Sequence, residues 1–196
     1  GHFLDEENNR IYNKYSDSLS KKEISKKIEE ELDVCNILQN SFKDFDGGYA
    51  LAGLIGHGSS FVARDPNGIR PLYYYVNDEV IVGTSERPPI KTAFGCEFDE
   101  IKELKRGNAL IVDKEGNYKV EEFIQPKENK ACSFERIYFS RGNDPEIYNE
   151  RKTLGKLLIP RILERNCANQ LFTTIPPSTF IIFGFKPSLF IASNKS

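Results

Sequence analysis

The sequence predicts an α+β fold of helices and antiparallel strands, and three features indicate it. Apolar residues recur every three or four positions over residues 21–42, which is typical of an amphipathic helix. Short runs rich in β-branched and aromatic residues then occupy residues 49–123, separated by Gly, Asn and Asp turns. A second helical pattern covers residues 145–165.

Size and charge set the first limits on function. The chain has 196 residues, which suits one domain or one domain and part of a second. Its 27 Lys and Arg residues are balanced by 29 Asp and Glu residues, giving a net charge of −2. No overall positive field is therefore available to recruit nucleic acid or an anionic membrane, and neither is expected as a partner.

The first predicted helix begins at a capping box. Ser20 and Glu23 have the spacing at which each side chain bonds the other's backbone amide. From there the apolar periodicity runs to Phe42 without a proline or glycine, so a single helix over residues 21–42 is expected.

Four strands are expected next, joined by tight turns into one antiparallel meander. They cover residues 49–55, 59–64, 69–76 and 79–84. The turn Asp65-Pro66-Asn67-Gly68 has residues suited to each turn position. It concentrates Arg64, Asp65 and Arg70 at one end of the predicted hairpin.

The rest of the chain predicts a second hairpin and a second helical segment. Strands over residues 108–113 and 118–123 flank a Lys-Glu-Gly-Asn turn, and residues 125–130, polar with one proline, have the composition of a linker. Beyond it we expect a strand over residues 132–140, a helix over 145–165 that Pro160 kinks or ends, and a strand over 171–175.

Cysteine usage and hydropathy indicate a reduced, cytoplasmic protein. The four cysteines are scattered without CxxC spacing and follow no secretory signal. The apolar run at residues 180–192 is too short for a membrane span and contains Lys186-Pro187. The chain starts at Gly1 and has no methionine, so we interpret it as an internal fragment or a processed chain.

Taken alone, the residues assemble no recognisable active site. His2 and His57 lack neighbours at metal-ligand spacing, and no glycine-rich loop joins a strand to a helix. A nucleophilic cysteine needs a base and an oxyanion hole, and neither lies near Cys35 or Cys132 in the sequence.

Three stretches nevertheless resemble one family. FVARDPNGIRPLYYY, VGTSERP and ACSFERIYFSRGNDPEIYNERKTLGKLL are similar to segments of the amidophosphoribosyltransferases, which are class II glutamine amidotransferases. The first stretch is shared with other class II enzymes, whereas the segment at residues 132–155 is much more specific. GHFLD at the start looks most like the longer family members of the Bacteroidetes type.

The resemblance implies a division of the chain. Residues 1–126 would be the C-terminal part of a glutaminase domain, a partial N-terminal-nucleophile αββα sandwich of antiparallel sheets. Residues 127–131 would be the linker, 132–176 the start of an α/β phosphoribosyltransferase domain, and 177–196 a divergent tail.

The implied function is that of a transferase of purine biosynthesis. Intact family members transfer glutamine-derived ammonia to phosphoribosyl pyrophosphate, with Mg²⁺, and give phosphoribosylamine in the first step of de novo purine synthesis. They are expected to be homo-oligomers that bind glutamine and phosphoribosyl pyrophosphate.

The resemblance also implies that this chain lacks the catalytic residues. The family's N-terminal nucleophilic cysteine and its oxyanion Asn-Gly pair are not found here, so the chain alone is expected to be inactive and to hold no cofactor. Cys132 matches an iron–sulfur ligand of some members, but a lone thiolate cannot hold a cluster, so no metal is expected. The expected supports of the site are buried charges at Arg64, Asp65, Arg70 and Glu86.

Two alternatives remain at this level. Another class II glutamine amidotransferase, such as an asparagine synthetase or a sugar-phosphate aminating enzyme, should lack the segment at residues 132–155. A non-catalytic interaction domain derived from such an enzyme should be stable and monodisperse on its own.

Overall fold

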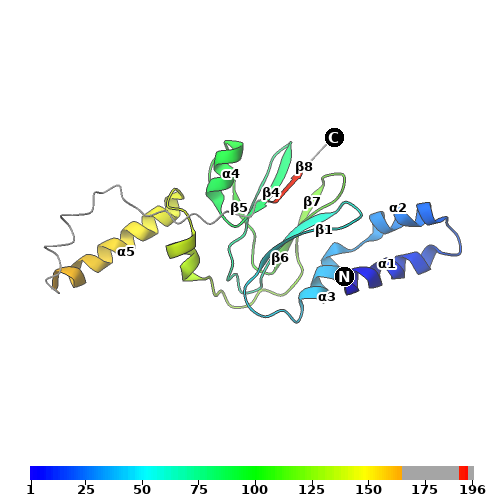
Figure 1. Cartoon of the computed structure of the whole chain (residues 1–196), viewed down its shortest axis with the longest axis horizontal. Helices are drawn as coiled ribbons and strands as arrows, with labels where there is room; N and C mark the ends of the chain where they lie inside the picture. Colours follow the sequence, from blue (N-terminus) through cyan, green and yellow to red (C-terminus); the bar gives the residue numbers. More distant parts are fainter. Residues whose placement is uncertain (165–189, 194–196) are drawn as a thin grey trace.

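The computed structural model describes residues 1–164 and 190–193, and it confirms an α+β fold with two antiparallel sheets. The helices are α1 (His2–Tyr15), α2 (Lys21–Glu31), α3 (Val34–Phe42), α4 (Arg87–Phe94), the π-helical turn η1 (Glu135–Phe139) and α5 (Pro145–Glu164). The strands are β1 (Ala50–Leu54), β2 (Ser60–Arg64), β3 (Tyr73–Val76), β4 (Val80–Thr84), β5 (Lys102–Glu103), β6 (Asn108–Val112), β7 (Tyr118–Glu122) and β8 (Phe190–Ser193). Figure 1 shows the sheets in the middle, with α5 extending at one end and α1 and α2 at the other.

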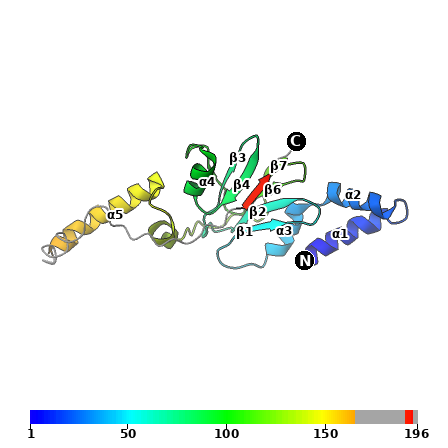
Figure 2. The ribbon, with the colours of Figure 1, turned by 45° about the horizontal axis from the view of Figure 1, so that its top comes forward.

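The two sheets stack face to face, and a helix covers each outer face. The first sheet has the order β1-β2-β6-β7 and the second β5-β3-β4-β8. Along β2, Val62 faces the second sheet and packs with Ile81, whereas Ala63 faces α3 and packs with Phe42. This alternation follows from the period of two in a strand and buries both faces of β2. The order of layers is α3, first sheet, second sheet and α4 (Figure 2).

The single helix expected over residues 21–42 is wrong, because the chain breaks at Leu32-Asp33. The capping box at Ser20 and Glu23 is confirmed, but α2 ends at Glu31 and Leu32 is extended. The Asp33 carboxylate accepts the amide of Asn36 at 3.0 Å and starts α3. An N-cap side chain that competes for backbone donors can therefore end one helix and begin the next.

Helix α1 was not expected from the sequence. Its Ile11 is completely buried and packs with Ile24 and Ile28 of α2. Helices α1 and α2 therefore share a small core of their own, while α3 packs on the first sheet.

The hairpins β1-β2, β3-β4 and β6-β7 are confirmed, but the single meander is wrong. Strand β2 belongs to the first sheet and β3 to the second, so the turn at residues 65–68 carries the chain between sheets. Strand β3 also starts late, at Tyr73, after Pro71, which has no amide to donate to a sheet.

The segment after residue 131 differs from its prediction in one element. The strand expected over residues 132–140 is wrong: the amide of Ser140 bonds the Glu135 carbonyl at 2.7 Å, which closes the π-helical turn η1. Helix α5 is confirmed and continues past Pro160 to Glu164. The strand expected at residues 171–175 lies outside the described residues, as does most of the tail. No helix in the described part of the chain is long and apolar enough to cross a bilayer.

Candidate functional site

The turn after β2 is organised by one carboxylate. Asp65 is completely buried, and its Oδ1 accepts the amides of Asn67 and Ile69, both at 3.0 Å. Its Oδ2 accepts the amide of Arg70 at 3.0 Å. Gly68 has a φ of +65°, a conformation that favours glycine. Three backbone amides of the turn thus donate to one charged acceptor, the Asp65 carboxylate, which holds the chain in this turn.

Arg64 is also buried, and it joins the two sheets. Its Nε donates to the Arg70 carbonyl at 2.8 Å, and its Nη1 donates to the Leu104 carbonyl at 2.6 Å. The same Nη1 pairs with the Glu103 carboxylate of β5 at 2.7 Å. Arg64 lies at the end of β2, so this guanidinium connects the first sheet to the edge of the second.

The predicted linker lies against the turn. The amides of Lys127, Lys130 and Cys132 donate to the carbonyls of Pro66, Asn67 and Ile69 at 2.8, 2.8 and 3.2 Å. Residues 127–132 are thereby tied along residues 66–69 by backbone hydrogen bonds.

The Arg70 side chain reaches the next segment. Arg70 is exposed, contrary to the expectation of a buried charge, because its guanidinium pairs with Glu135 of η1 at the surface and not with a group in the core. The Glu135 carboxylate is buried in this contact. The turn at residues 65–70 and the segment from residue 132 therefore form one surface.

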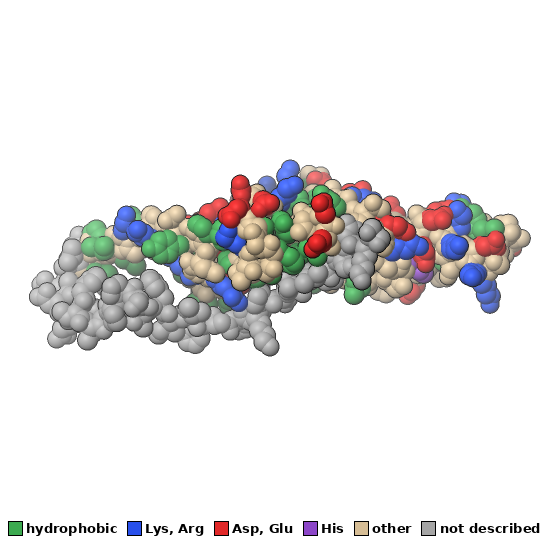
Figure 3. Space-filling view, turned by 90° about the horizontal axis from the view of Figure 1, so that it is seen from above, with side chains coloured by type: hydrophobic (Ala, Val, Ile, Leu, Met, Phe, Trp, Pro, Cys, Tyr) green, Lys and Arg blue, Asp and Glu red, His purple; other side chains and the backbone are tan. Residues whose placement is uncertain are grey.

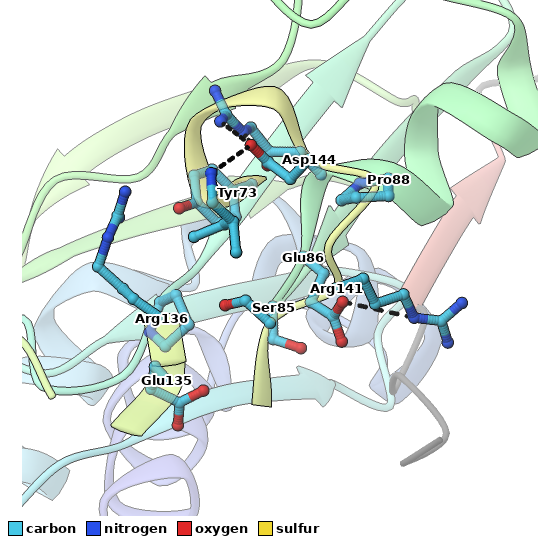
Figure 4. A pocket seen from close by; sticks show the side chains of 12 residues that line it. Tyr73, Ser85, Glu86, Pro88, Glu135, Arg136, Arg141 and Asp144 are labelled. Carbon is cyan, nitrogen blue, oxygen red and sulfur yellow. Dashed lines mark hydrogen bonds and ion pairs between the residues drawn. The ribbon is translucent and has the colours of Figure 1, made fainter. Parts of the chain in front are cut away.

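A small pocket lies between the start of α4 and the start of α5 (Figure 4). It has about 30 Å³ of free volume, and Tyr73, Ser85, Glu86 and Arg141 are among its lining residues. The Nε of Arg141 lies 3.5 Å from Glu86 Oε2, which is buried and has no hydrogen-bond donor among the described residues. Burial raises the pKa of Glu86, and the charge of Arg141 opposes this shift.

Arg87 and Asp144 form the most fully paired contact at this pocket. Arg87 Nε and Nη2 donate to the two Asp144 carboxylate oxygens at 2.8 and 2.7 Å. Its Nη1 donates to Glu146 at 3.0 Å. Burial disfavours the charge on Arg87, but the hydrogen bonds to these two carboxylates outweigh it and raise the pKa of Arg87.

The structure brings three of the four predicted support residues together. Arg64, Asp65 and Arg70 share one turn, whereas Glu86 lies in the pocket and contacts none of the other three through a hydrogen bond or ion pair in the described chain. Their support of a catalytic site stays a prediction. Sequence reasoning missed Arg87, Glu135 and Asp144. Asp144 precedes a proline that opens α5, which is an N-cap signal that could have identified it.

Cys35 and Cys96 lie in environments that disfavour the thiolate. Burial, with a smaller contribution from Glu121, raises the pKa of Cys35 to about 11. Cys96 is buried in the core below α4, and burial raises its pKa also. No group of three or more His, Cys, Asp or Glu residues among residues 1–164 and 190–193 could hold a metal ion.

Comparison with known proteins gives a domain match over residues 7–92, to a family described as a glutamine amidotransferase domain. The amidophosphoribosyltransferase of Bacillus subtilis is 33% identical over 130 residues, which are 62% of this chain and 25% of that protein. The amidophosphoribosyltransferase of Lachancea kluyveri is 32% identical over 138 residues, 63% of this chain and 26% of that protein. The chain thus spans about a quarter of the length of these relatives. They do not test the expected likeness to the Bacteroidetes enzymes.

A solved structure was also matched. The glutamine phosphoribosylpyrophosphate amidotransferase of Bacillus subtilis, in complex with ADP and GMP, is 26% identical and aligns with a TM-score of 0.46. The alignment covers 69% of this chain and 30% of that protein.

Proposed function

We propose that this chain, a relative of the amidophosphoribosyltransferases with a glutamine amidotransferase domain match, is a portion of an enzyme of that family. The proposed reaction of the whole enzyme transfers ammonia from glutamine to phosphoribosyl pyrophosphate and yields phosphoribosylamine. The portion at hand would supply the second half of the glutaminase domain and the first helix of the transferase domain.

One observation carries this proposal beyond the domain match. Two of the three stretches that resemble the family, residues 61–75 and 131–158, are in contact in the folded chain. Cys132 bonds Ile69 through the backbone, and Glu135 pairs with Arg70. A general class II domain would need only the first stretch, so an intact contact between both supports a two-domain amidophosphoribosyltransferase.

In this proposal the portion at hand has a structural role, because it supports the glutaminase site and supplies no reacting group. Asp65 and Arg64 hold the end of β2 and the edge of β5 in fixed positions. Burial raises the pKa of Cys35 and of Cys96, which disfavours the thiolate of both. The nucleophile of the proposed reaction would come from another part of the enzyme. The Mg²⁺ that accompanies phosphoribosyl pyrophosphate finds no ligand set among the described residues, and no step through it is assigned to them.

A chimera tests the proposal. The portion of the Bacillus subtilis relative that matches this chain would be replaced by the corresponding residues of this chain. Phosphoribosylamine formation would then be measured with glutamine and, separately, with ammonium as nitrogen donor. A control chimera would carry alanine in place of the nucleophilic cysteine of the Bacillus part.

Glutamine-dependent activity that disappears in the alanine control, while ammonium-dependent activity remains, would support the proposal. A folded chimera that uses ammonium but not glutamine would contradict it, because the transplanted residues would then fail to support the glutaminase. Circular dichroism melts of both chimeras would establish that they are folded.

A further inference from the structure

The Arg87 guanidinium lies at the boundary between α4 and α5, where its side chain is 12% exposed. All three of its nitrogens donate to carboxylates, two to Asp144 and one to Glu146. Its carbon lies 5.7 Å from the centre of the Tyr73 ring and 5.5 Å from that of Phe98. A guanidinium held bidentately and against aromatic rings is a strong and directional contact.

Asp144 uses the same carboxylate to start α5. Its Oδ1 accepts the amide of Glu146 at 3.0 Å, and its carbonyl accepts the amide of Tyr148 at 2.9 Å. The N-cap of the helix and the partner of Arg87 are thus one side chain. Because a cap contributes to helix formation, the first turn of α5 and its docking on α4 depend on each other.

Very little apolar surface holds this helix in place. Among the hydrophobic side chains described between residues 132 and 162, only Ile147 is buried, and the other buried residues are Glu135 and Asp144. Two further ion pairs cross the same boundary, Arg70 with Glu135 and Glu86 with Arg141. Arg151 then fastens η1 to α5 through the carbonyls of Arg136 and Ser140.

We propose that Arg87 and Asp144 form an electrostatic clasp, through which α5 docks on and separates from the sheets as a unit while both sheets stay folded. Closure forms the Arg87 ion pair and the cap of α5 together. Opening costs little apolar burial within residues 132–162, because Ile147 is the one buried hydrophobic side chain described there. The inference concerns the junction itself and does not depend on the proposed function.

Hydrogen–deuterium exchange of the full chain tests the clasp by comparing peptides from α5 with peptides from β6. Arg87→Met removes the ion pair. Asp144→Ser removes the same ion pair but keeps a side chain that can cap the helix, so it separates docking from capping. Arg161→Met, an exposed residue of the same helix, is the matched control.

We expect Arg87→Met and Asp144→Ser each to speed exchange over residues 146–158 by about tenfold or more, since a buried ion pair that loses one partner is strongly destabilised. Exchange in β6 should stay unchanged, and Arg161→Met should resemble the unmodified chain. The double variant should exchange no faster than the faster single variant, because the two substitutions remove the same contact between Arg87 and Asp144.

Unchanged exchange over residues 146–158 in Asp144→Ser would overturn the proposal. Equal acceleration in α5 and β6 by Asp144→Ser would also overturn it, because the contact would then stabilise the whole fold rather than the junction. Asp144→Ser decides the matter if Arg87→Met disturbs α4, since Asp144 lies outside both sheets.

Discussion

Asp65 shows how one residue can fix the path of a chain between two sheets. Its carboxylate is fully buried and serves three backbone amides, all at 3.0 Å. We predict that Asp65→Ala lowers the free energy of unfolding by about 3–5 kcal/mol, because the three donors lose a charged acceptor in a buried place. Urea unfolding would measure it, with the exposed Asp99→Ala as control. Equal stability of the two variants would refute the assignment.

Glu86 is a half-buried carboxylate whose contribution to stability should change with pH. Burial raises its pKa above the ordinary value of 4.5. A raised pKa means that the stability contributed by protonated Glu86 is complete below the ordinary value and is lost as pH rises through the raised one. Glu86→Gln should therefore match the unmodified chain near pH 4 and become more stable than it, by about 1 kcal/mol, near pH 7.

Melting curves across this pH range would provide the measurement for Glu86. Glu79→Gln, at an exposed position of the β3-β4 turn, serves as the control and should show no such divergence. A Glu86→Gln variant that is less stable at pH 7 than at pH 4, relative to the unmodified chain, would mean that the Arg141 ion pair outweighs the desolvation of Glu86.

Residue-level prediction succeeded where the signal was local. Arg64, Asp65 and Arg70 stand close together in the sequence, and the residues between them form the predicted turn, although it connects two sheets and not the strands of a hairpin. Their partners could not be foreseen, because Glu103 and Glu135 are far along the chain and only folding brings them near. Asp65 was expected among the charges, yet it bonds amides rather than a guanidinium.

At the scale of elements, the break between α2 and α3 yields a further prediction. The Asp33 carboxylate caps α3 through the amide of Asn36. Asp33→Ala should reduce stability by about 1 kcal/mol, as is usual for an N-cap. Thermal denaturation would measure this, with Asp44→Ala, at an exposed position just after α3, as control. No loss beyond the control would show that packing alone ends α2.

The same break shows why periodicity misled. Ile28, Leu32, Cys35 and Leu38 follow one another at spacings of three or four residues, which suit one continuous helical face, so the apolar pattern runs through the break. Yet Ile28 packs on α1 and Leu38 on the first sheet, so the two halves of the pattern serve different cores. Periodicity reports that a residue is buried, but not against which neighbour.

The strands show the same limit, because the sequence predicts each strand but not the neighbour with which it pairs. Each hairpin was predictable from its turn, because turn chemistry is local. Sheet membership was not, because β6 inserts beside β2 across more than forty residues of sequence and places β3 in another sheet. The α+β class followed from the composition of the elements, whereas the stacking of two sheets depends on which faces meet.

At the scale of the whole molecule, the sheets and the segment from η1 to α5 differ in how well their hydrophobic side chains are buried. The sheets and their helices bury a shared core, but α5 and η1 carry a set of exposed hydrophobic side chains (Figure 3). They include Phe134, Ile137, Tyr138, Tyr148, Leu154, Leu157, Leu158 and Ile159. Apolar surface of this extent on one element promotes association of chains. An independent interaction domain should be monodisperse, so this exposed surface counts against that alternative for this chain.

Leu157 provides the test, because it is 69% exposed and lies in α5 among these side chains. We predict that Leu157→Gln raises the concentration at which the chain stays monomeric by about threefold or more, since burial of an exposed leucine contributes to association. Leucine and glutamine have similar helix propensities, so the melting temperature should not change. Light scattering over a concentration series would measure the mass, with Lys156→Gln as the neighbouring control. If Leu157→Gln and Lys156→Gln associate alike, the apolar surface of α5 does not drive the contact between chains.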